Sequence, residues 1–584
     1  MESCFVMPHE DTPRQGLWLS PLDIFLPTGR CQCRSLGRKA KAPVVFSTSW
    51  QAVSVYFSRP IENQSGTEWT KGVDSNGRPD IDCNVEDTFF IVVPSKLTVD
   101  RDAFSHLKAE TERHRHRLLG KVTGGEAAEQ PTTARRRRPA SIFLLMDKAL
   151  KSEIEGVEEI ESCFIAPSED TPRQGLWLSP LDIVLANRGH TPNVYFYRRD
   201  VVAASANTDF FEVGRIKEAM AKALVAFYPL AGRLHVDGSS RPKIECNAEG
   251  ALFVVARSEL TVNDFSDLKP SPELRRLFVP RIEPVSIVLG IQVTFLSCGG
   301  VALGTVLHHA AIDALSACHF LQTWSSFCRD GEAAVVDLPC HDRTLLRARS
   351  PPVVHPDVHS MFSLKLNLCE PSGPISTKIF TISVHQLAAL KQICGGMSTF
   401  CAVSALVWQC MCVARQLPLD AETCVTFPVN IRRRVTPPLP DRYFGNALVI
   451  MKVASMVRDV VLGMLAASAA QIKSTLGRFD AELLQSVIDY NEIAGMSNKP
   501  AKGNLPDTEL RMIGWLGMPV YDVDFGWGKP EVMSRAESVR SGFVYMMDGT
   551  DNDGGGVRVL MCMEARKMEE FERLQYFLMD KALK

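Results

Sequence analysis

One histidine in this chain stands at a spacing that suits general-base chemistry. An apolar run, residues 301–307, ends at two histidines, and Asp313 follows His309 in the pattern His-x-x-x-Asp. A neutral imidazole with a pKa near ~6.5 can take a proton from an amine or hydroxyl at neutral pH. The pattern carries little weight by itself, because a core histidine followed by a helix-capping aspartate has the same spacing.

The elements that hold this pair follow from the apolar period. Residues 301–307 are typical of a buried strand, and beyond Asp313 the apolar residues recur at helical spacing as far as Phe327. The strand would therefore deliver His309 to a loop, and Asp313 would lie where a helix begins. Alternation along the strand points His308 to the opposite face from His309, so we expect His308 to pack in the core.

A second motif lies more than two hundred residues further along the chain. Residues 524–528 read Asp-Phe-Gly-Trp-Gly, a string that chance does not supply in a chain of this length. In this order the two motifs resemble those of the BAHD acyltransferases, whose signatures are His-x-x-x-Asp and Asp-Phe-Gly-Trp-Gly. The resemblance covers residues 161–584 and continues in LWLSPLD (176–182), FYPLAGRL (227–234), STF (398–400) and PPLPDRYFGNA (437–447).

This resemblance implies a fold and an activity. The fold would be α/β, with two similar chloramphenicol-acetyltransferase-like domains, each with a mixed sheet, and an active-site channel at their interface. The activity would be transfer of an aromatic acyl group, hydroxycinnamoyl or benzoyl, from coenzyme A to an amine or hydroxyl acceptor. The sequence shows no G-x-S-x-G nucleophile elbow, so we expect direct transfer without a covalent acyl-enzyme. Acyl-CoA would be a co-substrate, with no tightly bound cofactor and no metal.

The resemblance also assigns roles to residues. His309 would be the general base, and Asp313 would point away from the substrate and pair with Arg432, which would fix the loop that holds His309. The second motif would be structural near the CoA channel: Asp524, Phe525, Gly526, Trp527 and Gly528. Trp527 could donate its indole N–H to the oxyanion or simply pack. The candidates for contacts with CoA phosphates, with solvated surface as the alternative, are Lys529, Arg433 and Arg434.

The acceptor depends on a departure from the family pattern. Hydroxycinnamoyltransferases that use shikimate or quinate carry a Trp-Thr-Arg-Leu-Pro segment whose Arg clamps the acceptor carboxylate. Here residues 515–519 read Trp-Leu-Gly-Met-Pro, and Gly517 replaces the Arg, so we expect a non-acidic acceptor. This segment and residues 184–199 resemble grass-type enzymes that acylate amines. A shikimate or quinate O-transferase with a relocated clamp is the alternative. The acceptor-pocket candidates are Trp515, Gly517 and Ser179.

The chain contains a partial internal repeat. Residues 2–24 recur with three differences as residues 161–183, but the first copy has no counterpart of the amphipathic helix expected over residues 210–236. Residues 143–151 resemble the last nine residues, and residues from 161 onward resemble the start of the chain. A C-terminal sequence is thus followed by an N-terminal sequence, as in a fusion of a truncated relative to a complete unit. The predicted domains are 1–154, a non-catalytic or poorly ordered partial repeat with a basic linker; 155–348, with the His-x-x-x-Asp motif; 349–375, a crossover loop; and 376–584, with the second motif. A catalytically silent fusion that acts as a binding protein is the alternative of another class.

The composition of the chain gives no sign of a nucleic-acid, metal or membrane partner. The 65 basic and 67 acidic residues give a net charge of −2, which gives no reason to expect nucleic acid, and the basic block 135–138 indicates a solvated linker. The 17 cysteines show no paired metal-ligand spacing, and the N-terminus does not resemble a signal peptide. The longest uncharged stretch, 285–312, is broken by glycines and polar residues, so we expect no membrane span. A cytosolic, monomeric enzyme is expected.

Overall fold

The computed structural model describes five strands within the first 94 residues and then residues 156–199, 210–235, 241–265, 269–363, 368–370, 373–478, 480–495, 503–538, 540–549 and 555–582. The chain divides into two compact units, Met1–Arg137 and Arg138–Lys584. The basic block at 135–138 and the tail-like segment 143–151 lie outside the described residues.

The first unit contains one antiparallel sheet with the strand order β2-β1-β3-β4-β5. Its strands are β1 (Cys4–Met7), β2 (Leu17–Leu19), β3 (Val44–Thr48), β4 (Gln51–Phe57) and β5 (Phe90–Pro94). β4 and β5 pair directly, whereas their sequence counterparts in the second unit, β8 (His190–Tyr197) and β11 (Ala251–Ser258), are separated by two strands. The two intervening strands are formed by residues 289–296 and 301–308. The first copy has no sequence that matches them, so it cannot form the same sheet.

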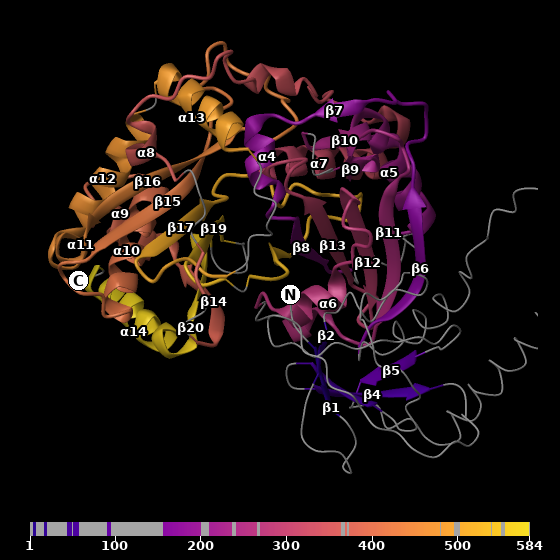
Figure 1. Ribbon diagram of the computed structural model, residues 1–584, viewed down its shortest axis with the longest axis horizontal. Helices are drawn as coiled ribbons and strands as arrows, with labels where there is room; N and C mark the ends of the chain where they lie inside the picture. Colours follow the sequence, from indigo (N-terminus) through magenta and orange to yellow (C-terminus); the bar gives the residue numbers. More distant parts are fainter. Residues whose placement is uncertain are drawn as a thin grey trace, which may run out of the picture. The chain divides into compact units, whose positions relative to one another are not determined.

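The N-terminal half of the second unit is built on a six-stranded mixed sheet with the order β18-β8-β13-β12-β11-β6, which we call the N-terminal sheet (Figure 1). Only β11 and β12 run parallel. Its other strands are β6 (Glu158–Ile165), β12 (Leu289–Leu296), β13 (Val301–His308) and β18 (Val532–Arg535). A small sheet accompanies it, with β7 (Gly175–Trp177), β9 (Arg233–His235) and β10 (Lys243–Glu245). The helices of this half are α4 (Pro180–Ala186), α5 (Val213–Ala226), α6 (Pro272–Phe278) and α7 (Ala314–Asp330), with 3-10 turns at Tyr228–Ala231, Val262–Phe265, Gly331–Ala333 and Arg343–Leu346.

The C-terminal half has a second six-stranded mixed sheet, the C-terminal sheet, with the order β14-β20-β19-β17-β15-β16. Its strands are β14 (Ile375–Ile382), β15 (Glu422–Asn430), β16 (Leu448–Met456), β17 (Glu509–Gly514), β19 (Phe543–Asp548) and β20 (Val557–Glu564). Its helices are α8 (Val358–Met361), α9 (Val384–Ile393), α10 (Thr399–Ala414), α11 (Val457–Leu462), α12 (Leu465–Gly477), α13 (Ala481–Ala494) and α14 (Ala565–Ala582). The prediction of two α/β layers with mixed sheets is confirmed.

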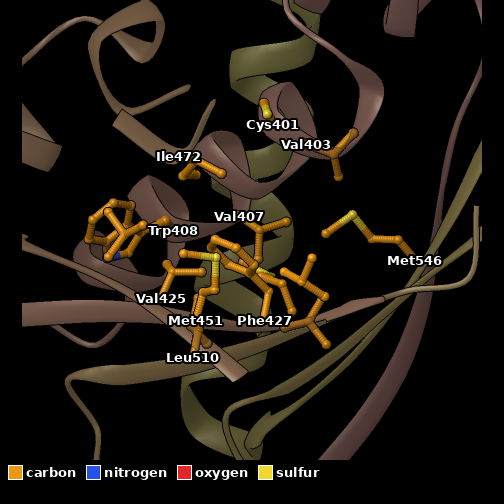
Figure 2. Packing of buried hydrophobic residues seen from close by; sticks show 14 of the residues in the cluster. Cys401, Val403, Val407, Trp408, Val425, Phe427, Met451, Ile472, Leu510 and Met546 are labelled. Atoms are coloured by element: carbon orange, nitrogen blue, oxygen red, sulfur yellow. The ribbon is translucent and has the colours of Figure 1, made fainter. Parts of the chain in front are cut away.

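The core of the C-terminal half forms where α10 packs on its sheet. Figure 2 shows Val407 and Trp408 of α10 near Val425 and Phe427 of β15 and Met451 of β16. α10 is apolar over almost its whole length and almost wholly buried, as expected for a helix with no solvent face. This packing leaves the opposite face of the sheet for the contact between the two halves.

Two features join the halves. β18 comes from the C-terminal segment of the chain but pairs with β8 at the edge of the N-terminal sheet. A buried apolar cluster also draws on both halves, with Leu303 and Leu307 from β13 and Trp515 and Tyr545 from the C-terminal half. The sequence boundary at 376 therefore does not separate the two sheets, and the crossover at 349–375 contains α8 and ends as β14 begins at Ile375.

The elements expected around the motif are present. β13 ends at His308 and α7 begins at Ala314, with Asp313 as its N-cap. The helix expected over 210–236 is shorter and spans Val213–Ala226, because a 3-10 turn follows at Tyr228. Within the described residues, no helix is both long and apolar enough to cross a bilayer.

Candidate active site

His309 lies on the short loop between β13 and α7. Its backbone N–H donates to the carbonyl of Gly189 at 2.9 Å, and its own carbonyl accepts from Nδ2 of Asn446 at 2.8 Å. Gly189 follows α4 in the N-terminal half, whereas Asn446 precedes β16 in the C-terminal half. Both halves therefore fix the backbone at His309.

The ring of His309 sits in a positive, poorly hydrated setting. Burial, followed by the charge of Arg188, lowers the pKa of His309 to about 4. Arg535 also lowers this pKa, whereas the residue's own carbonyl and the Asp313 carboxylate raise it. Nδ1 is buried and makes no hydrogen bond with a described residue. The imidazole is consequently neutral at physiological pH, the protonation state that a base requires.

His308 faces the other way, as predicted. It is 6% exposed, and its Nδ1 accepts the N–H of Ala310 at 3.2 Å. Its ring lies edge-on to His190, with centroids 4.8 Å apart. Burial lowers the pKa of His308 to about 3, so this residue is a neutral packing histidine.

Asp313 is held by a bidentate ion pair with Arg432. The carboxylate oxygens lie 2.7 and 3.0 Å from the two terminal guanidinium nitrogens. The same oxygens accept the backbone N–H of Ser316 at 3.0 Å, which caps α7, and of Ala447 at 3.1 Å. Both charged side chains are buried. Every lone pair of Asp313 is thus directed into the fold, and the neighbouring charge of Arg432 keeps the pKa of the carboxyl below its usual range despite burial.

The structure adds a second buried ion pair that the sequence did not indicate. Asp182 and Arg343 lie 2.9 Å apart, and both side chains are fully buried. The Asp182 carboxylate also accepts the hydroxyl of Ser179 at 2.8 Å and its backbone N–H at 2.9 Å, in the capping box of α4. The LSPLD letters at 178–182 were the available signal, but their partner Arg343 is 161 positions away.

This second pair reaches the His309 loop through two hydrogen bonds. Nδ2 of Asn446 donates both to Oδ1 of Asp182 and to the carbonyl of His309, each at 2.8 Å. Arg343 donates to the carbonyl of Ala311 at 2.7 Å. The loop is therefore tied at both ends, to Arg432 through Asp313 and to Asp182 through Asn446.

The Asp-Phe-Gly-Trp-Gly motif folds as a closed turn. Oδ1 of Asp524 accepts the backbone N–H groups of Gly526 at 2.8 Å and Gly528 at 3.0 Å. Both glycines have φ near +100°, a conformation that favours glycine. The Trp527 ring stacks on Phe211 with centroids 5.0 Å apart, so packing accounts for its place in the fold.

The candidates for phosphate contacts all lie on the surface. Lys529 pairs with Asp522 at 2.7 Å, and Arg433 pairs with Asp441 at 3.4 Å. Arg434 is exposed and donates to the carbonyl of Leu476 at 3.2 Å. None of these contacts involves the His309 loop, and their role toward CoA stays a prediction.

The acceptor-pocket candidates are placed differently from one another. Ser179 is fully buried and its hydroxyl is used by Asp182, so in this structure it offers no free atom to an acceptor. Trp515 is 8% exposed and lies edge-on to Tyr545, with centroids 5.6 Å apart. Gly517 has φ +67° and donates its N–H to Asp548 at 2.7 Å, in a turn where a Cβ would meet open space.

Two further observations bear on the chemistry. Ala314, which stands where the family often has Gly, is the first residue of α7, so its side chain causes no strain there. Among the described residues, no three His, Cys, Asp or Glu side chains are grouped as metal ligands. The described site brings together a neutral imidazole and a loop held by hydrogen bonds and ion pairs.

Comparison with known sequences gives consistent matches. A family model described as the Transferase family matches residues 155–578. A putrescine hydroxycinnamoyltransferase from rice (Oryza sativa subsp. japonica) is 42% identical over 72% of this chain and 98% of its own length. A hydroxycinnamoyl-CoA:5-hydroxyanthranilate N-hydroxycinnamoyltransferase from oat (Avena sativa) is 35% identical over 71% and 98%, and a shikimate O-hydroxycinnamoyltransferase from Nicotiana tabacum is 34% identical over 72% and 99%.

Solved structures share the fold. Vinorine synthase matches with a TM-score of 0.57 at 23% identity, over 72% of this chain and 98% of its own. The TRI101 enzyme of F. graminearum, complexed with coenzyme A and T-2 mycotoxin, matches with a TM-score of 0.58 at 18% identity, over 68% and 97%. The two signature motifs, the paired mixed sheets and these matches agree, and the chain belongs to the BAHD family of acyltransferases.

Proposed function

We propose that this chain transfers a hydroxycinnamoyl group from coenzyme A to an amine or hydroxyl acceptor, with His309 as the general base. The observation that carries the proposal is the place of His309 on a loop whose backbone is fixed by hydrogen bonds from both halves of the fold. Burial and Arg188 lower the pKa of His309 to about 4, which keeps the ring neutral at physiological pH. The relatives named above supply the donor class, since all three are hydroxycinnamoyltransferases, and their names cover amine and hydroxyl acceptors.

The reaction needs one base and no covalent enzyme intermediate. As the acceptor nitrogen or oxygen attacks the thioester carbonyl carbon, its proton passes to His309. The C–S bond then breaks, and the CoA thiolate leaves and recovers the proton from the imidazolium. We assign the base to Nε2, because Nδ1 is buried. Such general-base assistance contributes ~10²–10⁴-fold to the rate.

The surrounding ion pairs position this base. Asp313 has its oxygens occupied by Arg432 and two backbone N–H groups, so it acts through the loop rather than on the substrate. Asp182 acts on the other side of His309 through Asn446. A rigid loop keeps the reacting atoms in register, a contribution that accounts for a large share of catalysis in bimolecular reactions.

Acyl-CoA is the proposed co-substrate, and the CoA-bound TRI101 structures show that this fold accepts the molecule in a relative. The candidates for its phosphates remain Lys529, Arg433 and Arg434. We further propose a monomer in the cytosol. The unit carried by residues 155–584 would be the whole catalyst, with residues 1–154 non-catalytic.

A donor–acceptor screen tests the proposal. Purified protein is mixed with p-coumaroyl-CoA, benzoyl-CoA or acetyl-CoA and a panel of amines and alcohols, and the free CoA thiol is measured. The expected result is acceptor-dependent CoA release that is fastest with p-coumaroyl-CoA. No CoA release with any of the acyl-CoA donors and acceptors would instead favour a catalytically silent binding protein.

A further inference from the structure

Three arginines from separate elements lie where the two halves meet: Arg188 and Arg535 are close enough to His309 to lower its pKa, and Arg188 is close enough to Arg511 to do the same. Arg188 follows α4, Arg511 lies on β17, and Arg535 ends β18. Their positions in the sequence do not suggest a group, because Arg188 lies more than three hundred residues before the other two. Their surroundings differ from those of Arg343, Arg415 and Arg432, which are buried in ion pairs.

Arg188 is anchored directly beside the base. It immediately precedes Gly189, whose carbonyl accepts the backbone N–H of His309. Its guanidinium makes no hydrogen bond or ion pair with any residue that the structure describes. Arg188 is half-buried, and the desolvation of its guanidinium lowers its pKa to about 10.

Arg511 is more deeply buried and also lacks an acid. It is 2% exposed, and its donors reach two neutral groups, Oγ1 of Thr426 at 3.1 Å and Oγ of Ser363 at 3.0 Å. Its neighbours Leu510 and Met512 pack toward α10, so alternation along β17 turns Arg511 to the face that contacts the N-terminal half. Burial, followed by the charge of Arg188, lowers the pKa of Arg511 to about 9.

In the part of the chain that the structure describes, three other buried arginines each pair with a buried acid, whereas Arg511 does not. Arg343 pairs with Asp182, Arg415 with Glu564, and Arg432 with Asp313. Among the described residues no carboxylate lies within ion-pair distance of Arg511, even though Glu509 stands two positions before it on the strand. A buried cation without a counter-ion is costly, and a bound anion would offset that cost.

Arg535 extends the positive surface along the N-terminal sheet. Its Nε is buried without a partner, and its guanidinium lies 5.4 Å from the Tyr545 ring. On the same strand row, Oδ1 of Asn193 and Oγ1 of Thr305 are also buried and without hydrogen bonds. Thr305 alternates onto the same face of β13 as Leu303 and Leu307, which pack with Trp515 and Tyr545, so these atoms point toward the C-terminal half.

We propose that the acceptor carries a carboxylate that binds to Arg188 and Arg511 while its amine or hydroxyl meets His309. This deepens the proposed function and rests on it. It reverses the expectation drawn from Gly517, because the clamp is supplied by two other elements. A polyamine, which is cationic, would meet repulsion at the same place.

Two other sources of negative charge are less suitable. The phosphates of CoA are separated from the reacting thioester by the long pantetheine arm, whereas Arg188 adjoins the base. The remaining source is a donor whose acyl chain ends in a carboxylate, and the experiment below distinguishes such a donor from an acceptor with a carboxylate. A bound carboxylate would also offset the field of Arg188 at His309, so the acceptor would strengthen the base that activates it.

Matched acceptor pairs test the inference with the full-length protein and p-coumaroyl-CoA. Each pair differs in one carboxylate: tyrosine and tyramine, arginine and agmatine, shikimate and its methyl ester. We expect the member with the carboxylate to have the higher kcat/KM in each pair that reacts. Arg188→Gln and Arg511→Gln should each lower kcat/KM for the member with the carboxylate ~10–100-fold, a larger loss than for its ester or amine partner, and the KM for p-coumaroyl-CoA should change little.

Conservative and distant variants complete the design. Arg188→Lys and Arg511→Lys keep the charge and should recover part of the preference, and melting temperatures report any loss of folding. Arg458→Gln removes an exposed arginine from α11 and should leave the preference intact. A preference for tyramine over tyrosine or agmatine over arginine in the unmodified protein would overturn the inference but not the acyl transfer, and so would a preference for the carboxylate that survives Arg188→Gln. Malonyl-CoA serves as a donor whose acyl chain ends in a carboxylate. If the Gln variants lose activity with malonyl-CoA but keep the preference for acceptors with a carboxylate, the inference is overturned. The absence of turnover with every acceptor pair and donor would overturn the proposed function as well.

Discussion

A histidine whose neighbours are arginines is a weaker base than a free imidazole, but it stays neutral over a wider range of pH. Burial and Arg188 lower the pKa of His309 to about 4. The lowered value means that the ring takes up a proton only when the pH falls well below ~6.5. His309 is therefore a weaker base than a free imidazole, but in the free enzyme it stays unprotonated over a wider range of pH.

The pH dependence of kcat/KM follows from this setting. We expect kcat/KM to stay flat as the pH falls from 8 to 5 and to decline only toward about 4, since kcat/KM reports the free enzyme. In Arg188→Gln the acid limb should move to higher pH, because a positive neighbour is removed, while Arg535 and the opposing charge of Asp313 remain. Initial rates at each pH, with return to pH 7 as a control for reversible folding, measure this. An acid limb between pH 6 and 7 in the unmodified protein would contradict the assignment.

At the scale of elements, the His309 loop depends on ion pairs that are buried on both sides. Asp182→Asn should reduce the free energy of unfolding by about 3 kcal/mol, since Arg343 would keep its charge in a fully buried place without its partner. It should also lower kcat, because Asn446 loses one of its two anchors. Urea unfolding and steady-state rates measure the two effects. Asp459→Asn, which removes an exposed partner of Arg458, is the control, and equal stability of the two variants would argue against the network.

The strand that delivers His309 approaches its neighbour closely at one glycine. A Cβ at Gly304 of β13 would lie 1.7 Å from the backbone carbonyl of Phe278, so Gly304→Ala must displace the backbone. We expect a loss of at least ~1–3 kcal/mol in stability by chemical unfolding. Gly477→Ala, at the end of α12, meets nothing within 4 Å and should be neutral or slightly stabilising. A neutral Gly304→Ala would mean that β13 and Phe278 are farther apart than in this structure.

Local pattern was sufficient to predict β13 and α7, because an apolar strand and a capped amphipathic helix are both written in consecutive residues. It was not sufficient for β18, a four-residue strand whose place beside β8 depends on pairing across the whole chain. The arginines at 188 and 511 escaped notice for the same reason. Charged residues in a sequence are expected at the surface, and only the fold shows that Arg511 is buried and that no described carboxylate pairs with Arg188 or Arg511.

At the scale of the whole molecule, the two units differ in what they contain. The first unit has strands that echo β8 and β11 but pairs them directly, and its sequence has neither the His-x-x-x-Asp motif nor the strand that would carry it. The family match begins at residue 155. Residues 155–584 therefore include every group assigned to the reaction.

Removal of residues 1–154 should leave catalysis unchanged. The shortened protein is expected to keep the kcat, the KM values and the melting temperature of its main transition, because the hydrogen bonds that hold the His309 loop are made by residues 155–584. Kinetics and calorimetry on both forms make the comparison. A large drop in kcat/KM for the shortened form, at equal solubility, would show that the first unit takes part in catalysis.

The central claim is that His309 removes the acceptor proton, and the kcat of His309→Ala tests it most directly. With p-coumaroyl-CoA and the best acceptor from the screen, kcat should fall ~10²–10⁴-fold, with an unchanged melting temperature and little change in the KM for p-coumaroyl-CoA. Equal turnover by His309→Ala and the unmodified protein would contradict the account.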